Sequence, residues 1–184
     1  MVVTRIRRGY LVGFLLLLTV VLVSVAVRFL VHDRGPTVTI VSPEGRTETI
    51  SLAELKRMPT IRRNGVYQNQ YGNWRDEGVY VGVRLVDLIG GDADYASIQV
   101  VAEDGYAATI ERERVEDNAF PMVLSYAFEG REAPGWPDGY RIAVLPEHGS
   151  VGNEEYGVVS AGSYWVKNVD RIILQATPSS SSVY

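Results

Sequence analysis

Residues 97–110 read SIQVVAEDGYAATI, and this stretch decides the fold class. Two runs rich in β-branched and apolar residues, 97–102 and 106–110, stand on either side of Asp104-Gly105. An Asp-Gly pair between two such runs favours a tight turn between antiparallel strands. We therefore expect a β-hairpin here, and we expect 141–145, which has the same character, to form another strand of the same domain.

Strands are also expected towards both ends of the domain. Residues 37–41 and 47–50 alternate between apolar and polar side chains on either side of a Ser-Pro-Glu-Gly turn, a pattern that indicates a second hairpin. Residues 166–175 alternate in the same way and close the domain. The strands therefore extend over the whole length of the domain.

Two short helices are expected between these strands. Residues 51–56 begin with Ser51 and carry Glu54 three positions later, the pattern of a capping box, and Pro59 ends the helix. Residues 83–89 place leucine and valine at helical spacing before two glycines. The fold class that follows is a single mixed α+β domain of short strands and short helices.

The segments between these predicted elements indicate where the loops lie. Residues 64–80 and 129–164 are expected to contain long loops, which in a compact domain are usually functional. We assign residues 37–176 to this one domain and 177–184 to a disordered serine-rich tail.

The N-terminal part predicts a membrane anchor. Residues 10–31 form an apolar run long enough to span a bilayer once, and the basic segment 1–9 favours a cytoplasmic N-terminus. Residues 32–36 then serve as a linker, so the domain lies outside the cytoplasm in contact with the lipid membrane through 10–31. The alternative is a cleaved signal peptide, although this apolar run is longer than usual for one.

Composition restricts the chemistry. The chain has no cysteine, which excludes disulfides and thiolate-bound metals. Its net charge is −4 and its basic residues are scattered, so we expect no nucleic-acid partner.

Several short motifs occur in the order found in a known family. They are a Ser-Leu-x-x-Leu helix at 51–59, a Gly-Asn loop at 70–74, a Gly-Val-x-Leu-x-Asp-Leu segment at 82–89 and an Asp-Gly-Tyr hairpin at 104–106. These are followed by a Leu-x-Tyr stretch at 124–134, a strand into Pro-x-x-Gly at 141–149 and a closing Trp-Val segment at 164–172. From 51 to 174 the chain thus resembles the molybdopterin-binding domain of the sulfite oxidase family of oxidoreductases. The resemblance implies the sulfite-oxidase-type fold and a cofactor pocket. By resemblance that pocket contains Gln70, Tyr71, Gly72, Asn73, His148, Ser163 and Tyr164.

The residues that carry the chemistry differ from the family pattern. The family ligates molybdenum with a cysteine in a Cys-x-Gly-Asn loop, and this chain has Gln70 at that position. A neutral amide is a poor replacement for a soft anionic sulfur. The family also holds the cofactor phosphate with lysines where this chain has Ser163 and Tyr164. We therefore expect no cofactor and no metal, with molybdopterin as the alternative, and we assign no catalytic residue.

Other residues of these loops admit two interpretations. His148 is either a ligand-binding or acid–base group or a solvent-exposed loop histidine, and we favour the second. Tyr67, Tyr71, Trp74 and Tyr80 are crowded together, which is typical of a binding surface or of core beneath a loop.

Three hypotheses about function remain. The domain is a non-catalytic binding module for a ligand or another envelope protein. Alternatively, it is a molybdopterin-dependent oxidoreductase, or a subunit of a redox complex, with the metal held only by the pterin dithiolene. A third hypothesis is a structural module of a membrane or cell-surface assembly.

Overall fold

The computed structural model describes residues 18, 19 and 35–176, and the chain divides into one unit of residues 1–35 and one of 36–184. Of the predicted anchor only Leu18 and Thr19 are described, and both are helical. The rest of the predicted anchor, nearly all of the flanking segments predicted at 1–9 and 32–36, and the predicted tail at 177–184 lie outside the described residues. Within the described part, no helix has the length and apolar character needed to cross a membrane.

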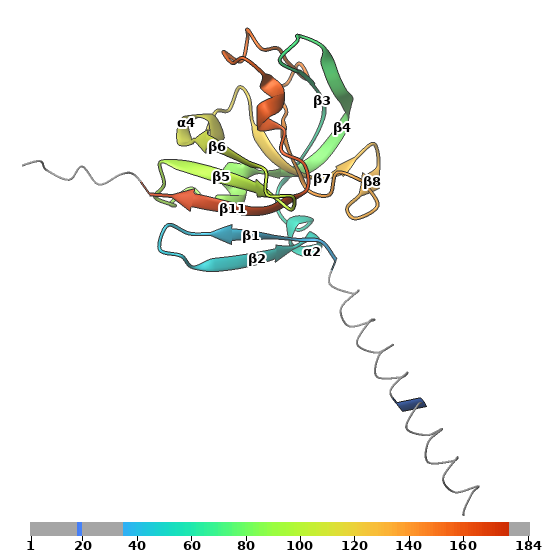
Figure 1. Ribbon diagram of the computed structural model, residues 1–184, viewed down its shortest axis with the longest axis vertical. Helices are drawn as coiled ribbons and strands as arrows, with labels where there is room; N and C mark the ends of the chain where they lie inside the picture. The colour runs from blue at the N-terminus through green and yellow to red at the C-terminus, as the bar shows by residue number, and fades with distance from the viewer. Residues whose placement is uncertain (1–17, 20–34, 177–184) are drawn as a thin grey trace, which may run out of the picture. The chain divides into compact units, whose positions relative to one another are not determined.

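The second unit is a single mixed α+β domain made mostly of strands (Figure 1). Its first sheet has the strand order β2-β1-β11-β5-β6. These strands are β1 (Thr37–Val41), β2 (Thr47–Ser51), β5 (Ser97–Ala102), β6 (Ala107–Glu111) and β11 (Val169–Gln175). β1 pairs with β11 in parallel, and the other neighbours are antiparallel. The expected strands at 37–41, 47–50, 97–102, 106–110 and 166–175 are confirmed in this sheet, with shifts of a few residues at their ends.

The second sheet has the order β10-β3-β4-β7-β8, with β9 paired to β7. Its strands are β3 (Thr60–Gln68), β4 (Trp74–Arg84), β7 (Met122–Phe128), β8 (Arg131–Glu132), β9 (Arg141–Val144) and β10 (Ser150–Val151). Three short α-helices and one 3₁₀ helix connect the strands: α2 (Leu52–Leu55), α3 (Leu85–Ile89), α4 (Arg112–Val115) and η1 (Ala161–Tyr164). Buried residues from both sheets form one hydrophobic core.

The predicted capping box forms at the start of α2. The Ser51 hydroxyl accepts a hydrogen bond from the Glu54 backbone N–H, and the Glu54 carboxylate accepts one from the Ser51 backbone N–H. The two donors would otherwise be unpaired at the helix start. The helix predicted at 83–89 is also present, but β4 runs through Arg84 and α3 begins only at Leu85.

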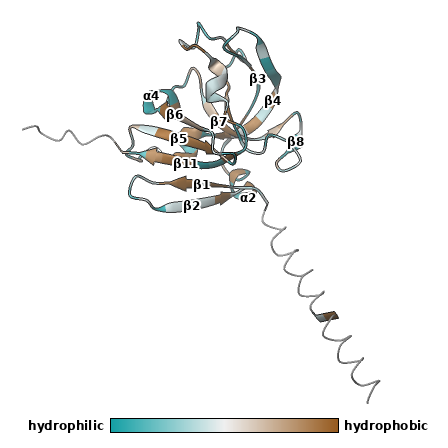
Figure 2. Ribbon diagram, in the orientation of Figure 1, coloured by the Kyte–Doolittle hydropathy of each residue, from teal (hydrophilic) through white to brown (hydrophobic). Residues whose placement is uncertain are grey.

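The loop predicted at 64–80 is wrong. Residues 60–68 and 74–84 form the long antiparallel β3–β4 hairpin, and only five residues form its turn. Figure 2 shows that the outer half of this hairpin is mainly hydrophilic, which explains why the pattern is misleading. Hydrophobic alternation is a weak signal in strands with few apolar residues.

The loop predicted at 129–164 is correct only in part. β8, the expected strand β9, β10 and η1 interrupt it. β7 was not predicted as a strand, although six of its seven residues are buried. A strand buried on both faces lacks the alternation by which half-buried strands are recognised.

Candidate functional site

The candidate site begins at the turn of the β3–β4 hairpin. The Asn69 side-chain oxygen accepts hydrogen bonds from the backbone N–H groups of Tyr71 (2.9 Å) and Asn73 (3.0 Å). The Asn69 backbone also exchanges hydrogen bonds with Gly72 and Asn73. Gly72 has φ of +76°, which glycine adopts without strain. The turn is therefore closed by its own polar groups.

The side chains of this turn point into solvent. Gln70 is exposed, the Tyr71 side chain is 77% exposed, and Trp74 at the start of β4 is 51% exposed. Two large aromatic side chains thus lie exposed within four residues of one turn, and aromatic side chains with polar groups are frequent on binding surfaces. We call Gln70, Tyr71 and Trp74 the hairpin tip.

Asn153 attaches the hairpin tip to the segment that follows β10. Its backbone N–H donates to the Gln68 side-chain oxygen (2.9 Å), and its side-chain amide donates to the Asn69 carbonyl (2.8 Å). The Asn153 side-chain oxygen accepts from the Ala161 backbone N–H (2.8 Å) at the start of η1. One side chain thus joins three segments, which restricts the motion of the tip relative to the domain.

His148 lies at a different level of the hairpin from Gln70. β10 runs parallel to β3 with Ser150 opposite Val66, so His148 stands beside the middle of β3 and Gln70 lies beyond its end. His148 Nε2 is 2.8 Å from Glu155 Oε1, and both side chains are about half exposed. Among the described residues no group of three or more metal-ligating side chains comes together.

Ser163 and Tyr164 lie in η1, next to β3. The Ser163 hydroxyl donates to the Ser160 carbonyl (2.7 Å). The Tyr164 ring packs edge-on against Tyr156, with ring centroids 5.5 Å apart, and the Arg114 guanidinium lies 5.4 Å from its centroid. Asn153 therefore brings η1 and the hairpin turn together, while His148 stands apart from them.

A buried ionic cluster lies under the hairpin, and the sequence analysis did not identify it. Arg141, at the start of β9, is only 1% exposed. Its guanidinium donates to Asp76 Oδ2 and to Asp138 Oδ2, the latter at 2.9 Å. Lys167 Nζ lies 3.3 Å from Asp76 Oδ2 and 3.1 Å from Asp138 Oδ2. Two cations and two carboxylates thus balance, as a buried charge requires. We call these four residues the Arg141 cluster.

Aromatic rings enclose this cluster. The Arg141 guanidinium carbon lies 5.8 Å from the ring centroids of Tyr67 and Tyr80 and 5.3 Å from that of Trp165. The Tyr80 hydroxyl donates to the Asp76 carbonyl (2.6 Å). Tyr80 and Trp165 are therefore core residues, whereas Tyr71 and Trp74 are surface residues. Of the four crowded aromatics of the sequence, Tyr80 thus lies in the core, Tyr67 packs against it, and the other two are exposed.

Neighbouring charges and burial shift the pKa values of Asp76, in the cluster, and of Tyr67 beside it. Burial would raise the pKa of Asp76, but the hydrogen bond and charge of Arg141, helped by Lys167, outweigh it and lower that pKa. Burial, with the Asp76 carboxylate, raises the pKa of Tyr67. At neutral pH Asp76 is thus an anion and Tyr67 a neutral donor, and the Tyr67 hydroxyl lies 3.3 Å from Asp76 Oδ2.

Asp76 also has an unusual backbone conformation, with φ of +53°. Such a conformation is uncommon for residues other than glycine and is best tolerated by aspartate and asparagine. It turns the Asp76 carboxylate towards Arg141 from within a strand whose neighbours, Arg75 and Glu77, are exposed. The cluster thus anchors the outer part of the hairpin to β9 and Lys167.

The sequence matches no protein-family model and no curated protein sequence. Among solved structures, the domain is similar to the sulfane dehydrogenase SoxCD from Paracoccus pantotrophus, with a TM-score of 0.55 and 14% sequence identity. The likeness covers 77% of this chain and 38% of that one. This likeness concerns the fold alone. The domain is a mixed α+β domain whose fold is similar to part of that dehydrogenase, and the matched region spans well under half of the neighbour's length.

The residues at the candidate pocket do not fit a molybdopterin centre. Gln70 offers a neutral, solvent-exposed amide where a soft anionic ligand is needed. His148 is paired with Glu155, and the Ser163 hydroxyl is used by Ser160. Lys167, a cation close to η1 in sequence, is neutralised by Asp76 and Asp138. The described residues at the predicted pocket therefore do not supply the cysteine and lysine groups that the resemblance implies for this cofactor.

Proposed function

We propose that this chain is a membrane-anchored, extracytoplasmic binding module that engages an envelope protein through the hairpin tip. The observation that carries the proposal is the outward placement of Tyr71 and Trp74 on a braced turn. Exposed aromatic side chains on a fixed backbone lose little conformational freedom on binding, and such residues are frequent among those that dominate interface energies. Catalysis at molybdenum is not part of the proposal.

The anchor in this proposal is the apolar run at 10–31, with the basic segment 1–9 on the cytoplasmic side. The domain then lies outside the cytoplasm, which is where an envelope protein would be met. Protease treatment of cells whose outer envelope has been opened, with the inner membrane still sealed, tests this topology. The protease should digest the domain, and full protection of the domain would contradict the proposed topology.

Affinity purification from native membranes tests the binding role. Tyr71→Ala combined with Trp74→Ala should remove a partner that copurifies with the wild type, because the interface would lose both aromatic groups. The control is Tyr106→Ala, since Tyr106 is as exposed as Trp74 but lies outside the tip, in the turn just before β6. Equal retention of the partner by the double variant would contradict the proposal. Near-ultraviolet circular dichroism would confirm that each variant is folded.

A second candidate, a molybdopterin-dependent oxidoreductase or a subunit of one, is favoured by the fold and by the family's Gly-Asn pair at Gly72-Asn73. Metal and pterin analysis of the full-length protein from its native membrane separates the two candidates. Near-stoichiometric molybdenum with pterin would support the oxidoreductase. Metal-free, pterin-free protein that still binds its partner would support the binding module.

A further inference from the structure

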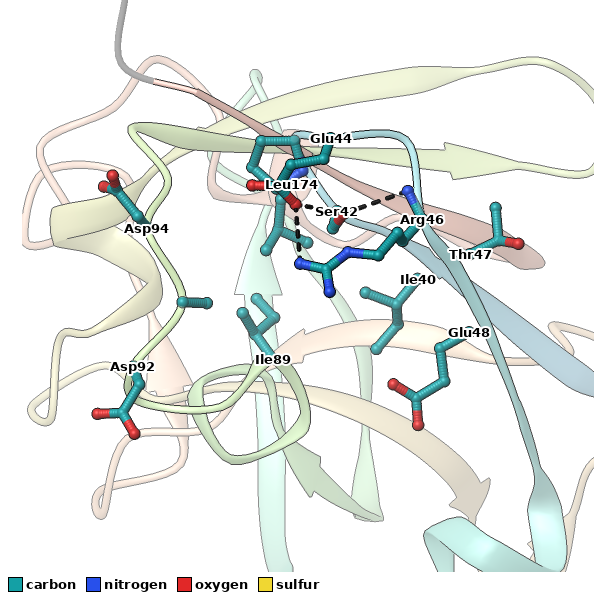
Figure 3. A pocket seen from close by; sticks show the side chains of 12 residues that line it. Ile40, Ser42, Glu44, Arg46, Thr47, Glu48, Ile89, Asp92, Asp94 and Leu174 are labelled. Carbon is teal, nitrogen blue, oxygen red and sulfur yellow. Dashed lines mark hydrogen bonds and ion pairs between the residues drawn. The ribbon is translucent and has the colours of Figure 1, made fainter.

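A cleft of about 560 Å³ lies between the β1–β2 hairpin and the segment that follows α3 (Figure 3). Its floor is apolar and consists of Ile40, Ile89 and Leu174. Figure 3 shows Glu44 and Glu48 on the hairpin side of this floor, Arg46 extending over it, and Asp92 and Asp94 on the opposite wall with their carboxylates turned to the outer side of that wall. The cleft is therefore hydrophobic at its base, and four acidic residues and one basic residue line its rim.

The pairing register explains how the floor and the rim meet. Ile40 on β1 is directly opposite Glu48 on β2, and paired residues point to the same face of a sheet. Ile40 is 8% exposed and belongs to the core. Glu48 therefore lies on the core-facing side of the sheet, one strand further out. A carboxylate thus replaces the apolar side chain that would otherwise extend the core.

Most of the rim charge is not compensated. Glu44 Oε2 accepts a hydrogen bond from the Ser42 hydroxyl (2.8 Å) and pairs with Arg46 Nη2 (3.2 Å). Within residues 35–176, Glu48, Asp92 and Asp94 have no ion pair. A lysine or arginine side chain complements such a site, because its aliphatic stem covers an apolar surface while its charged end reaches the carboxylates.

The strand that borders the cleft is open. β2 is the last strand of its sheet, and no described strand pairs with its outer edge. An exposed edge presents unpaired backbone N–H and C=O groups, to which an extended peptide can add as another strand. In an added strand every second side chain would point to the face that carries Glu48, and so into the cleft.

We propose that β2 and this cleft bind an extended basic segment of a partner polypeptide, by strand addition with alternate lysine or arginine side chains placed over the apolar floor beside Glu48. This site goes beyond the hairpin tip, since it lies on the other sheet and uses none of the tip residues. Its two recognition elements are the open backbone edge and the apolar, negatively charged cleft.

Fluorescence anisotropy of a dye-labelled Lys-Val-Lys-Val-Lys-Val-Lys peptide, with full-length protein in a neutral detergent, tests the proposal. The peptide should bind, and its counterpart with glutamate in place of lysine should not. Glu48→Gln should weaken binding about twofold to fivefold, the range for one exposed ion pair. Glu113→Gln is the matched control, because Glu113 is an exposed carboxylate on α4, outside the cleft.

A second peptide separates strand addition from simple charge attraction. Methylation of every backbone nitrogen on the pairing side leaves the lysines in place but removes the hydrogen-bond donors, and binding should fall at least tenfold. Equal binding of the methylated peptide would overturn the proposal. So would equal losses in Glu48→Gln and Glu113→Gln, or binding of spermidine as tight as that of the peptide.

Discussion

Replacing Arg141 with methionine, a side chain of similar length without charge, would remove the centre of the Arg141 cluster. The guanidinium is 1% exposed and binds two carboxylates, Asp76 and Asp138. Without it, Lys167 alone faces both anions. We therefore expect the domain to lose stability and the outer half of the β3–β4 hairpin to lose its attachment to β9.

The size of the effect can be bounded from burial. Removing one partner of a buried ion pair costs about 3–5 kcal/mol, because the other charge remains without compensation. The Asp76 and Asp138 side chains are 32% and 22% exposed, so both can regain some hydration. Lys167 also remains. The loss should consequently lie at the lower end, about 3 kcal/mol, or roughly 10 °C in melting temperature for a domain of this size.

Urea unfolding of the full-length protein in neutral detergent, followed by tryptophan fluorescence, measures this loss. Trp165 lies 5.3 Å from the guanidinium and serves as a local probe. Arg131→Met is the matched control, because Arg131 is exposed and pairs with no carboxylate among the described residues, so it should change stability by less than about 0.5 kcal/mol. A loss below about 1 kcal/mol for Arg141→Met would refute the central role given to the cluster.

Three further predictions concern pH, close packing and the helix cap. The lowered pKa of Asp76 means that its ionised form stabilises the fold above the unfolded-state pKa near 3.9, and that this contribution is lost as pH falls towards the folded-state pKa. Asp76→Asn, which tolerates the same backbone conformation, should therefore be less stable than wild type at pH 7 in urea titrations, and the difference should narrow by pH 3. Gly82→Ala would place a Cβ 2.2 Å from the Leu124 carbonyl oxygen and should cost about 3 kcal/mol in the same assay, whereas Gly91→Ala meets no atom within 4 Å and should be neutral. Ser51→Ala removes one half of the capping box and should lower the unfolding free energy by about 1 kcal/mol.

Elements with local signals could be predicted from the sequence. The Asp104-Gly105 turn, the Ser51–Glu54 capping box and the alternation in 37–41 each depend on residues close together in the chain. All three appear in the structure where they were expected. The mixed α+β class with mostly short strands was also predicted and is confirmed, whereas the sulfite-oxidase-type fold implied by the motif order is supported only by the similarity to one dehydrogenase structure.

Elements that depend on distant partners could not be predicted. The outer β3–β4 hairpin has few apolar residues, and its strands are recognisable mainly from their mutual pairing. Asp76 and Arg141 are 65 positions apart, so no local pattern joins them. One signal was available: a charged Arg141 opens the otherwise apolar strand 141–145, and a charge in such a place requires partners. The role of Asn153 as a brace had no comparable signal.

Site-specific photo-crosslinking in native membranes tests the central claim most directly. A benzophenone amino acid would be introduced in place of Tyr71 or Trp74, with Tyr106, which is as exposed as Trp74, as the control position. The account predicts that the same envelope protein is crosslinked from positions 71 and 74 and is absent from position 106. Failure to crosslink a protein from either tip position, or equal crosslinking from all three, would contradict the claim that the hairpin tip is the binding surface.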